Sequence, residues 1–492
     1  MFLQLGLRLC MFVHGLHSPA ETEPVRLNMS GDAFPETALR LLAAYRSGTI
    51  APEQVIKRSY ERLRQRDDSA VFISVRPEHE ALTEARELSR RSSDLPLYGI
   101  PVAVKDNIDV AGLPTTAACP AFSYEPERDA TAVARLRASG AIVIGKANLD
   151  QFATGLVGVR SPYGVPRNAF NSKLVPGGSS SGSAVAVAAG IVPLALGTDT
   201  AGSGRVPAGL NNIVGLKPSL GIVPTTGVVP ACRTLDCVSV FALTTDDAWL
   251  ALSVMAGLDK EDAYARARPV GALDQLPNGI RLGVPRSKQR LFFDREFESA
   301  YAQSLEKFEE LGCTLIETDM QPFYETARLL YEGPWVAERA VVVRELLASI
   351  PDAIHPVTRA IIEPGLRISA ANAFATFYRL EELRRTAERV FNTIDMLAVP
   401  TAPAAYTVEQ VLADPIKLNS NLGTYTNFVN LLDLCGIAVP ASVTANGVPF
   451  GITLLAPGGQ DAKTASLGRA FHAEARLPYG ALAMPSHQLT GD

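Results

Sequence analysis

Ser203 lies in a stretch that could supply a nucleophile. The sequence GTDTAGSGRVPA, residues 197–208, follows the apolar run VPLAL and contains three glycines. Such glycines let successive backbone N–H groups face one point, as stabilisation of an oxyanion requires. Asp199 and Arg205 could pair to hold the loop in shape. A phosphate cradle and a purely structural turn are the alternatives, and the stretch contains no histidine that could take the Ser203 proton.

A second serine-rich stretch, VPGGSSSGSAVAVAAG over residues 175–190, runs into an alanine-valine helix. It contains G-x-S-x-G centred on Ser180, but a nucleophile elbow also needs an acid and a histidine further along the chain. A phosphate nest is a second interpretation, although the lysine of a P-loop is missing. A loop that supplies one relay hydroxyl is the third. The chain has six histidines, with no evident catalytic setting or metal-ligand spacing: His14, His17, His79, His355, His472 and His487.

Lys105 is the candidate base, because it follows the apolar run VAV at the end of a predicted strand. Burial disfavours a charged ammonium, so the pKa of a lysine in this position should fall. The alternatives are that the side chain reaches the edge of the sheet or pairs with Asp106 or Asp109.

Short apolar strands alternate with small-residue helices from residue 98 onward, which indicates an α/β fold. Upstream, the pattern predicts two helices within residues 36–66, the second with a possible N-cap at Thr49. A strand-helix-strand unit is expected within residues 279–320, and mostly helix over 322–395. We therefore predict one large α/β domain over 31–478 with a helical insertion near 320–395.

The two ends of the chain differ from this pattern. Residues 1–30 resemble a signal peptide weakly, but Arg8 and His14 interrupt the apolar run and no A-x-A site follows. We expect a disordered extension upstream of a natural start at Met29, with a secretory signal as the alternative. Residues 479–492 form a tail without a clear pattern.

Composition narrows the function classes. The net charge of −5 provides no basic footprint for nucleic acid or for an anionic membrane. No run outside the N-terminus approaches the ~20 apolar residues of a membrane span. The six cysteines are scattered without a C-x-x-C pair, which suits a reducing cytoplasm better than a disulfide framework or a zinc site.

Together, the three regions resemble the amidase signature family, whose hallmark is a Ser-Ser-Lys triad. The order Lys105, Ser179, Ser203 and the gaps of 74 and 24 residues match that family. The resemblance implies a large mixed, twisted sheet covered by helices on both faces. It also implies that Ser203 is the nucleophile, that Ser179 follows a cis peptide bond and relays the proton, and that Lys105 is the base. It assigns the oxyanion hole to the backbone N–H groups of Thr200, Ala201, Gly202 and Ser203.

Several segments resemble the allophanate hydrolase branch of the family: GGSSSG, TAGSGR, TTGVVPACRTLDCVSVFALT and LYEGPWVAER. In that branch a tyrosine and an arginine eight residues apart recognise the substrate carboxylate, and the matching pair is Tyr331 and Arg339. On one helix, eight residues would leave the two side chains ~80° apart and ~12 Å apart along the axis, and Pro334 would bend that helix. The alternative is a core Tyr331, with Arg339 paired to an acid such as Glu338 or Glu332.

The resemblance implies hydrolysis of allophanate to N-carboxycarbamate and ammonia, without a cofactor or a metal. The substrate would be a small anionic amide, in the nitrogen catabolism of urea, cyanurate or s-triazines. A biuret- or malonamate-type amidase, or a non-catalytic anion-binding or amidotransferase-subunit module, is the alternative. We expect a cytoplasmic homodimer that binds neither nucleic acid nor membrane.

Overall fold

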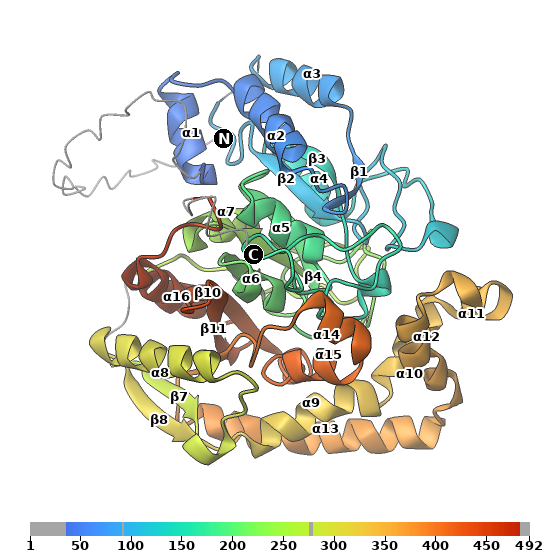
Figure 1. The fold of residues 1–492 in the computed structure, drawn as a ribbon, viewed down its shortest axis with the longest axis vertical. Coiled ribbons are helices and arrows are strands. Elements are labelled where there is room, and N and C mark those ends of the chain that lie inside the picture. The colour runs from blue at the N-terminus through green and yellow to red at the C-terminus, as the bar shows by residue number, and fades with distance from the viewer. Residues whose placement is uncertain (1–35, 91–92, 275–278, 483–492) are drawn as a thin grey trace, which may run out of the picture. The chain divides into compact units, whose positions relative to one another are not determined.

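The computed structural model describes residues 36–90, 93–274 and 279–482 (Figure 1). The predicted extension over 1–30 and the end of the tail lie outside these ranges. The strands are β1 Phe72–Val75, β2 Pro101–Lys105, β3 Ile142–Ala147, β4 Leu194–Asp199, β5 Val214–Lys217, β6 Cys237–Ala242, β7 Arg281–Pro285, β8 Thr314–Thr318, β9 Met396–Pro400, β10 Leu434–Val443 and β11 Pro449–Pro457. The α-helices are α1 Ala38–Arg46, α2 Pro52–Arg66, α3 Glu78–Leu88, α4 Thr131–Ala138, α5 Ser181–Ala188, α6 Val206–Leu210, α7 Thr245–Met255, α8 Arg295–Glu310, α9 Gln321–Glu332, α10 Trp335–Val342, α11 Arg344–Ser349, α12 Pro356–Ile362, α13 Ala370–Phe391, α14 Val408–Ala413, α15 Lys417–Leu422 and α16 Asp461–Ala475. Short 3-10 helices are η1 Pro120–Phe122, η2 Gln151–Ala153, η3 Ser287–Gln289, η4 Pro351–Ala353 and η5 Glu363–Arg367.

The strands of the described residues form one mixed sheet in the order β1-β3-β2-β4-β6-β5-β10-β11-β9-β7-β8. Strand β2 runs parallel to β3 and β4, and β7 runs parallel to β8 and β9, whereas the strands between these groups are antiparallel. Because β2 and β4 are parallel neighbours, their carboxyl ends lie at the same edge of the sheet. This register places Lys105 near Thr198 and the loop that follows it.

The centre of the sheet is covered on both faces. Every residue of β2, β4 and β6 is buried, and successive side chains of a strand point to opposite faces. Helix α5 packs against β2 and β4, α7 against β5 and β6, and α16 against β10 and β11. The small residues of α5 are all buried, which explains why alanine and valine dominate a helix that lies close to the sheet. The predicted amidase-like architecture is confirmed.

The first helices form where the pattern predicts them, but one cap differs. Helix α2 begins at Pro52, and its N-cap residue is Ala51, without a side-chain hydrogen bond to the helix. The predicted N-cap at Thr49 is wrong. Its hydroxyl instead lies 2.7 Å from Ser47 Oγ, because Thr49 stands too far before the proline that fixes the first turn.

Helices α9 to α13 lie between β8 and β9 in the chain, over the range expected for an insertion, and are grouped at the lower right of Figure 1. Helix α9 packs against α13 and α10, and α10 packs against α12 and η5. The break between α9 and α10 falls at Gly333 and Pro334.

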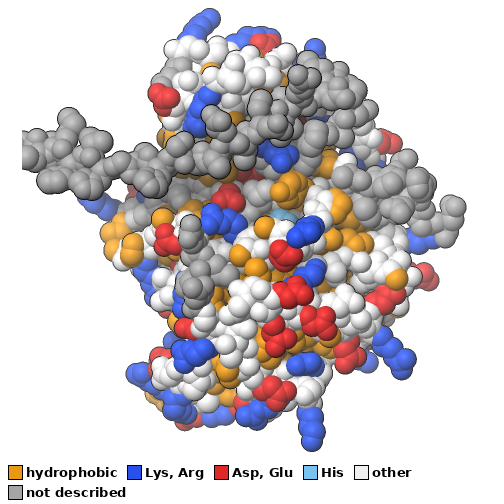
Figure 2. Space-filling view, turned by 90° about the vertical axis from the view of Figure 1, so that its left-hand side faces the viewer, with side chains coloured by type: hydrophobic (Ala, Val, Ile, Leu, Met, Phe, Trp, Pro, Cys, Tyr) orange, Lys and Arg blue, Asp and Glu red, His pale blue; other side chains and the backbone are white. Residues whose placement is uncertain are grey.

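The face of the molecule in Figure 2 carries basic and acidic side chains in mixture, without a continuous field of one sign. Elsewhere in the described chain, charged side chains pair locally, as Arg379 does with Glu325 and Glu382. Within the described ranges, no helix combines the length and apolar character needed to cross a bilayer.

Candidate active site

Lys105, Ser179 and Thr198 form a buried polar cluster at the carboxyl ends of β2 and β4. Lys105 Nζ donates hydrogen bonds of 2.8 Å to Ser179 Oγ and to Thr198 Oγ1. Ser179 lies just before α5, and the peptide bond between Gly178 and Ser179 is cis, as the family resemblance implies. The structure therefore brings two of the three predicted triad residues into direct contact.

The surroundings of Lys105 favour a neutral amine. Its side chain is completely buried, and this desolvation lowers its pKa to about 7. The negative charges of Asp150, Asp236 and Asp199 oppose the shift without cancelling it. The alternative pairing of Lys105 with Asp106 is wrong, because Asp106 forms its ion pair with Lys146 at 3.2 Å. A lysine in this state can accept a proton near neutral pH.

The loop after β4 presents Ser203 together with unpaired backbone donors. Among the described residues, none of the N–H groups of residues 200–203 donates a hydrogen bond, although the loop is buried. Ser203 Oγ donates a weak hydrogen bond of 3.5 Å to Gly155 O. Gly202 has φ +137°, and a Cβ at this position would lie 2.4 Å from Thr426 Oγ1. Buried backbone N–H groups without a partner, in the same loop as a serine, are the kind of donors that an oxyanion hole needs.

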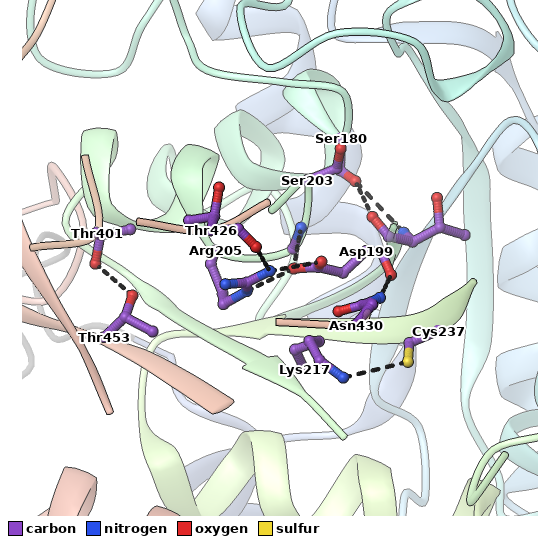
Figure 3. Close-up of polar contacts among 12 residues, drawn as sticks. Ser180, Asp199, Ser203, Arg205, Lys217, Cys237, Thr401, Thr426, Asn430 and Thr453 are labelled. Atoms are coloured by element: carbon purple, nitrogen blue, oxygen red, sulfur yellow. Dashed lines mark hydrogen bonds and ion pairs between the residues drawn. The ribbon is translucent and has the colours of Figure 1, made fainter. Parts of the chain in front are cut away.

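Asp199 and Arg205 support this loop from below (Figure 3). The guanidinium donates two hydrogen bonds of 2.9 Å to the carboxylate, and both side chains are fully buried. Burial alone would raise the pKa of Asp199, but Arg205 and Lys217 hold it below its usual value. Asn430 Nδ2 donates a hydrogen bond of 2.8 Å to the backbone carbonyl of Asp199. The structure thus places the two predicted loop-supporting residues in direct contact.

Asp236 holds the other side of the same loop. Its carboxylate accepts a hydrogen bond from Thr200 Oγ1 and from the backbone N–H groups of Ala231 and Cys232. Burial raises the pKa of Asp236 to about 6, against the lowering effect of these hydrogen bonds. The residue therefore fixes the first member of the predicted oxyanion hole.

Tyr331 and Arg339 meet, but by a different route from the one expected. They lie on two helices, α9 and α10, so the prediction of one bent helix with a ~12 Å separation along its axis is wrong. The chain turns at Gly333 and Pro334, and the Arg339 guanidinium carbon lies 5.6 Å from the centre of the Tyr331 ring. This is the geometry of a cation–π contact.

Arg339 is 2% exposed and has free hydrogen-bonding capacity. Its Nη1 donates a hydrogen bond of 3.0 Å to Thr154 Oγ1, while Nε and Nη2 have no hydrogen-bond partner among the described residues. Glu338, the suggested acidic partner, instead accepts hydrogen bonds from Thr234. A buried guanidinium with two open donors is suited to a carboxylate.

The competing interpretations of the serine-rich stretch find less support. Ser180 Oγ donates 3.2 Å to Thr198 O and so belongs to the packing between α5 and β4. His355 Nδ1 accepts from the Val357 N–H as a helix cap, and His472 is buried on α16. Within the described ranges, no cluster of three or more His, Cys, Asp or Glu could hold a metal ion.

Sequence reasoning missed Thr198, Asp236, Asp150 and Thr154. Thr198 stands in the GTD motif and Asp236 in TLD, so both belong to segments that carry the family resemblance. Asp150 and Thr154 lie between the motifs, where no pattern of residue types marked them. Asp150 acts through backbone N–H groups and Thr154 through an arginine 185 residues away, and residue spacing encodes neither contact.

The chain belongs to the amidase family, whose model matches residues 54–464. Its fold is that of the amidase signature enzymes.

Several known proteins are similar to this chain over most of its length. Urea amidolyase of Lachancea kluyveri is 48% identical over 364 residues, which are 73% of this chain and 20% of that protein. The chain therefore spans about a fifth of the length of the urea amidolyases it matches. A glutamyl-tRNA(Gln) amidotransferase subunit of Symbiobacterium thermophilum is 34% identical, covering 89% of this chain and 98% of that one. Allophanate hydrolase of Kluyveromyces lactis has a TM-score of 0.86 at 42% identity, covering 91% of this chain and 75% of the solved one.

Proposed function

We propose that this protein hydrolyses allophanate to N-carboxycarbamate and ammonia. The observation that carries the proposal is the buried Arg339 guanidinium, which has two open N–H donors and stacks on Tyr331. Allophanate is small and planar, with a primary amide at one end and a carboxylate at the other. Arg339 would bind the carboxylate with two parallel hydrogen bonds. The similarity to proteins named allophanate hydrolase and urea amidolyase supports this choice.

In the first half of the reaction, Ser203 Oγ attacks the carbonyl carbon of the terminal amide. Its proton passes to Ser179 Oγ as the Ser179 proton passes to neutral Lys105, because Ser179 is both donor and acceptor. The backbone N–H groups of residues 200–203 stabilise the oxyanion. Lys105 then returns the proton through Ser179 to the leaving nitrogen, ammonia departs, and an acyl ester remains on Ser203.

In the second half, water attacks the acyl carbonyl while the same relay takes its proton. The bond from the carbonyl carbon to Ser203 Oγ breaks, the serine regains a proton, and the carboxylic acid leaves. With allophanate this product is N-carboxycarbamate, which decarboxylates without help from the protein.

The test is ammonia release from allophanate by the wild-type protein and by Ser203→Ala. We expect the variant to lose at least about a thousandfold in kcat, because removal of a nucleophile leaves only binding and the oxyanion hole. The matched control is Ser180→Ala, which removes a neighbouring hydroxyl that bonds to Thr198 O. If Ser203→Ala keeps full turnover, the assignment of the nucleophile is wrong.

Substrate identity is tested by a panel of allophanate, biuret, malonamate and fatty amides. Arg339→Ala should raise KM for allophanate strongly, and an unchanged KM would favour an amidase of another specificity. A fluorophosphonate that labels Ser203 would contradict the alternative of a non-catalytic anion-binding or amidotransferase-subunit module. Tight phosphate binding without labelling would support that alternative.

The reaction as proposed needs no cofactor or metal. A cytoplasmic homodimer remains our expectation for the assembly and compartment, and sedimentation of the purified protein tests the dimer directly.

A further inference from the structure

A buried turn over residues 150–160 connects the parts of the site. Its centre is the Asp150 carboxylate, which accepts hydrogen bonds from three backbone N–H groups: Val157 at 3.2 Å, Gly158 at 2.9 Å and Arg160 at 2.9 Å. Asp150 is fully buried. These bonds fold the chain back on itself, so the residues between 150 and 157 have a fixed path.

The same turn touches three elements of the site. The Asp150 N–H donates a hydrogen bond of 3.0 Å to Ser179 O, next to the cis peptide bond. Gly155 O accepts the hydrogen bond from Ser203 Oγ. Between these points, Thr154 Oγ1 accepts the hydrogen bond from Arg339 Nη1. One short segment thus contacts the proposed relay, the nucleophile and the carboxylate-binding arginine.

The hydroxyl of Thr154 is held in one orientation. It donates a hydrogen bond of 3.2 Å to Phe152 O, which leaves its lone pairs free to accept from Arg339. The bond from Arg339 Nη1 to Thr154 Oγ1 is the hydrogen bond that joins the guanidinium to the rest of the described chain. It therefore determines which edge of Arg339 stays open. The Thr154 carbonyl also accepts a hydrogen bond of 2.9 Å from Arg160 Nη1, so the backbone of Thr154 is held in place as well.

We propose that Thr154 is a positioning residue that makes the enzyme specific for amides with a carboxylate at a set distance from the scissile bond. This inference rests on the proposed function, and it identifies how that site chooses its substrate class. Thr154 presents the Nε and Nη2 edge of Arg339 to the substrate, while its neighbour Gly155 contacts the nucleophile. The turn therefore sets the separation between the carboxylate-binding and reacting ends.

The experiment compares Thr154→Val with Thr154→Ser. Valine has the shape of threonine but cannot accept the Arg339 hydrogen bond, whereas serine can. The matched control is Thr358→Val, because Thr358 is a buried threonine of α12 whose hydroxyl has no partner among the described residues. The substrates are malonamate and its uncharged isostere 3-methylbutanamide, and the rate of Ser203 labelling by a fluorophosphonate monitors the folded site.

We expect Thr154→Val to raise KM for malonamate about tenfold or more, since its buried guanidinium loses an acceptor. The same variant should keep kcat/KM for 3-methylbutanamide and the labelling rate within about twofold, and Thr154→Ser should restore malonamate hydrolysis. Thr358→Val should behave as wild type. An equal loss on both substrates, or no rescue by serine, overturns the inference in favour of a structural role.

The result also separates this inference from the proposed function. If wild type prefers malonamate but Thr154→Val keeps that preference, only the role of Thr154 is wrong. If wild type shows no preference for a carboxylate, and malonate does not protect Ser203 from labelling, the carboxylate specificity fails and the role of Thr154 fails with it.

Discussion

Lys105 is the residue on which the proposed chemistry depends most. It occupies a site without an ion-pair partner among the described residues, between two hydroxyls that can exchange protons with it. Nearby carboxylates act only at longer range, and Asp199 is already neutralised by Arg205. In the proposed mechanism, the serine nucleophile therefore relies on a lysine base whose basicity is set by desolvation.

The pH profile of kcat/KM should report this lysine. Its protonated form predominates below a pKa of about 7 and cannot accept the Ser179 proton, so activity should fall as pH decreases through this value and level off above it. The measurement is kcat/KM for a primary amide from pH 5 to 9. Lys105→Arg should be inactive across the range, because a guanidinium stays charged. A profile that is flat down to pH 5.5 would argue against Lys105 as the base.

At this scale, the sequence marks the residues to which we assign the chemistry more clearly than those to which we assign a positioning role. Lys105, Ser179 and Ser203 stand in motifs with a defined order and spacing. Asp150 and Thr154 act through backbone amides and a guanidinium 185 residues away, and nothing in their local sequence distinguishes them from ordinary turn residues. Such contacts exist only once the turn and α10 have folded against each other.

Among the elements, the junction of α9 and α10 has the most direct effect on the site. On one continuous helix, Tyr331 and Arg339 would be separated along the helix axis. Instead, α9 ends at Glu332 and α10 begins at Trp335. The ring then covers one face of the guanidinium. Strand and helix positions in the sheet region were predictable from periodicity, whereas the direction of this turn depends on how α9 and α10 pack against α13 and η5.

Gly333→Ala should disturb this junction selectively. A Cβ on Gly333 would lie 2.4 Å from Leu329 O and 3.0 Å from Thr376 Cγ2, so the backbone at the junction must shift. We expect KM for allophanate to rise about tenfold, with a loss of ~1–3 kcal/mol in the free energy of unfolding. Steady-state kinetics and urea unfolding measure the two effects. Glu332→Ala, a neighbour at the end of α9, is the control. Unchanged kinetics in Gly333→Ala would show that the junction tolerates the methyl group.

Across the whole molecule, titratable groups with shifted pKa values change the free energy of unfolding in opposite directions as the pH falls. Burial raises the pKa of Asp236 and of Asp247 to about 6. The folded state therefore takes up their protons before the unfolded state does, and their contribution to stability grows as pH falls from 6 toward 3.8. Desolvation also acts to raise the pKa of Asp395, but hydrogen bonds from Arg281 and Lys463 outweigh it and lower the pKa to about 2, so its contribution is lost only below pH 3.8.

His472 lowers stability on acidification, against the effect of Asp236 and Asp247, over nearly the same pH range. It is buried on α16, with its ring 5.9 Å from that of Tyr479, and burial lowers its pKa from 6.5 to about 4. Below pH 6.5 the unfolded chain binds a proton that folded His472 does not bind, so stability is lost as pH falls from 6.5 to 4. The loss should total about 3 kcal/mol, from a shift of ~2.5 pKa units. His472→Gln removes this titration while keeping a polar side chain. Urea unfolding from pH 4.5 to 7.5 should show that the variant loses less stability on acidification than wild type. Parallel curves for the two proteins would mean that His472 is protonated equally in the folded and unfolded states.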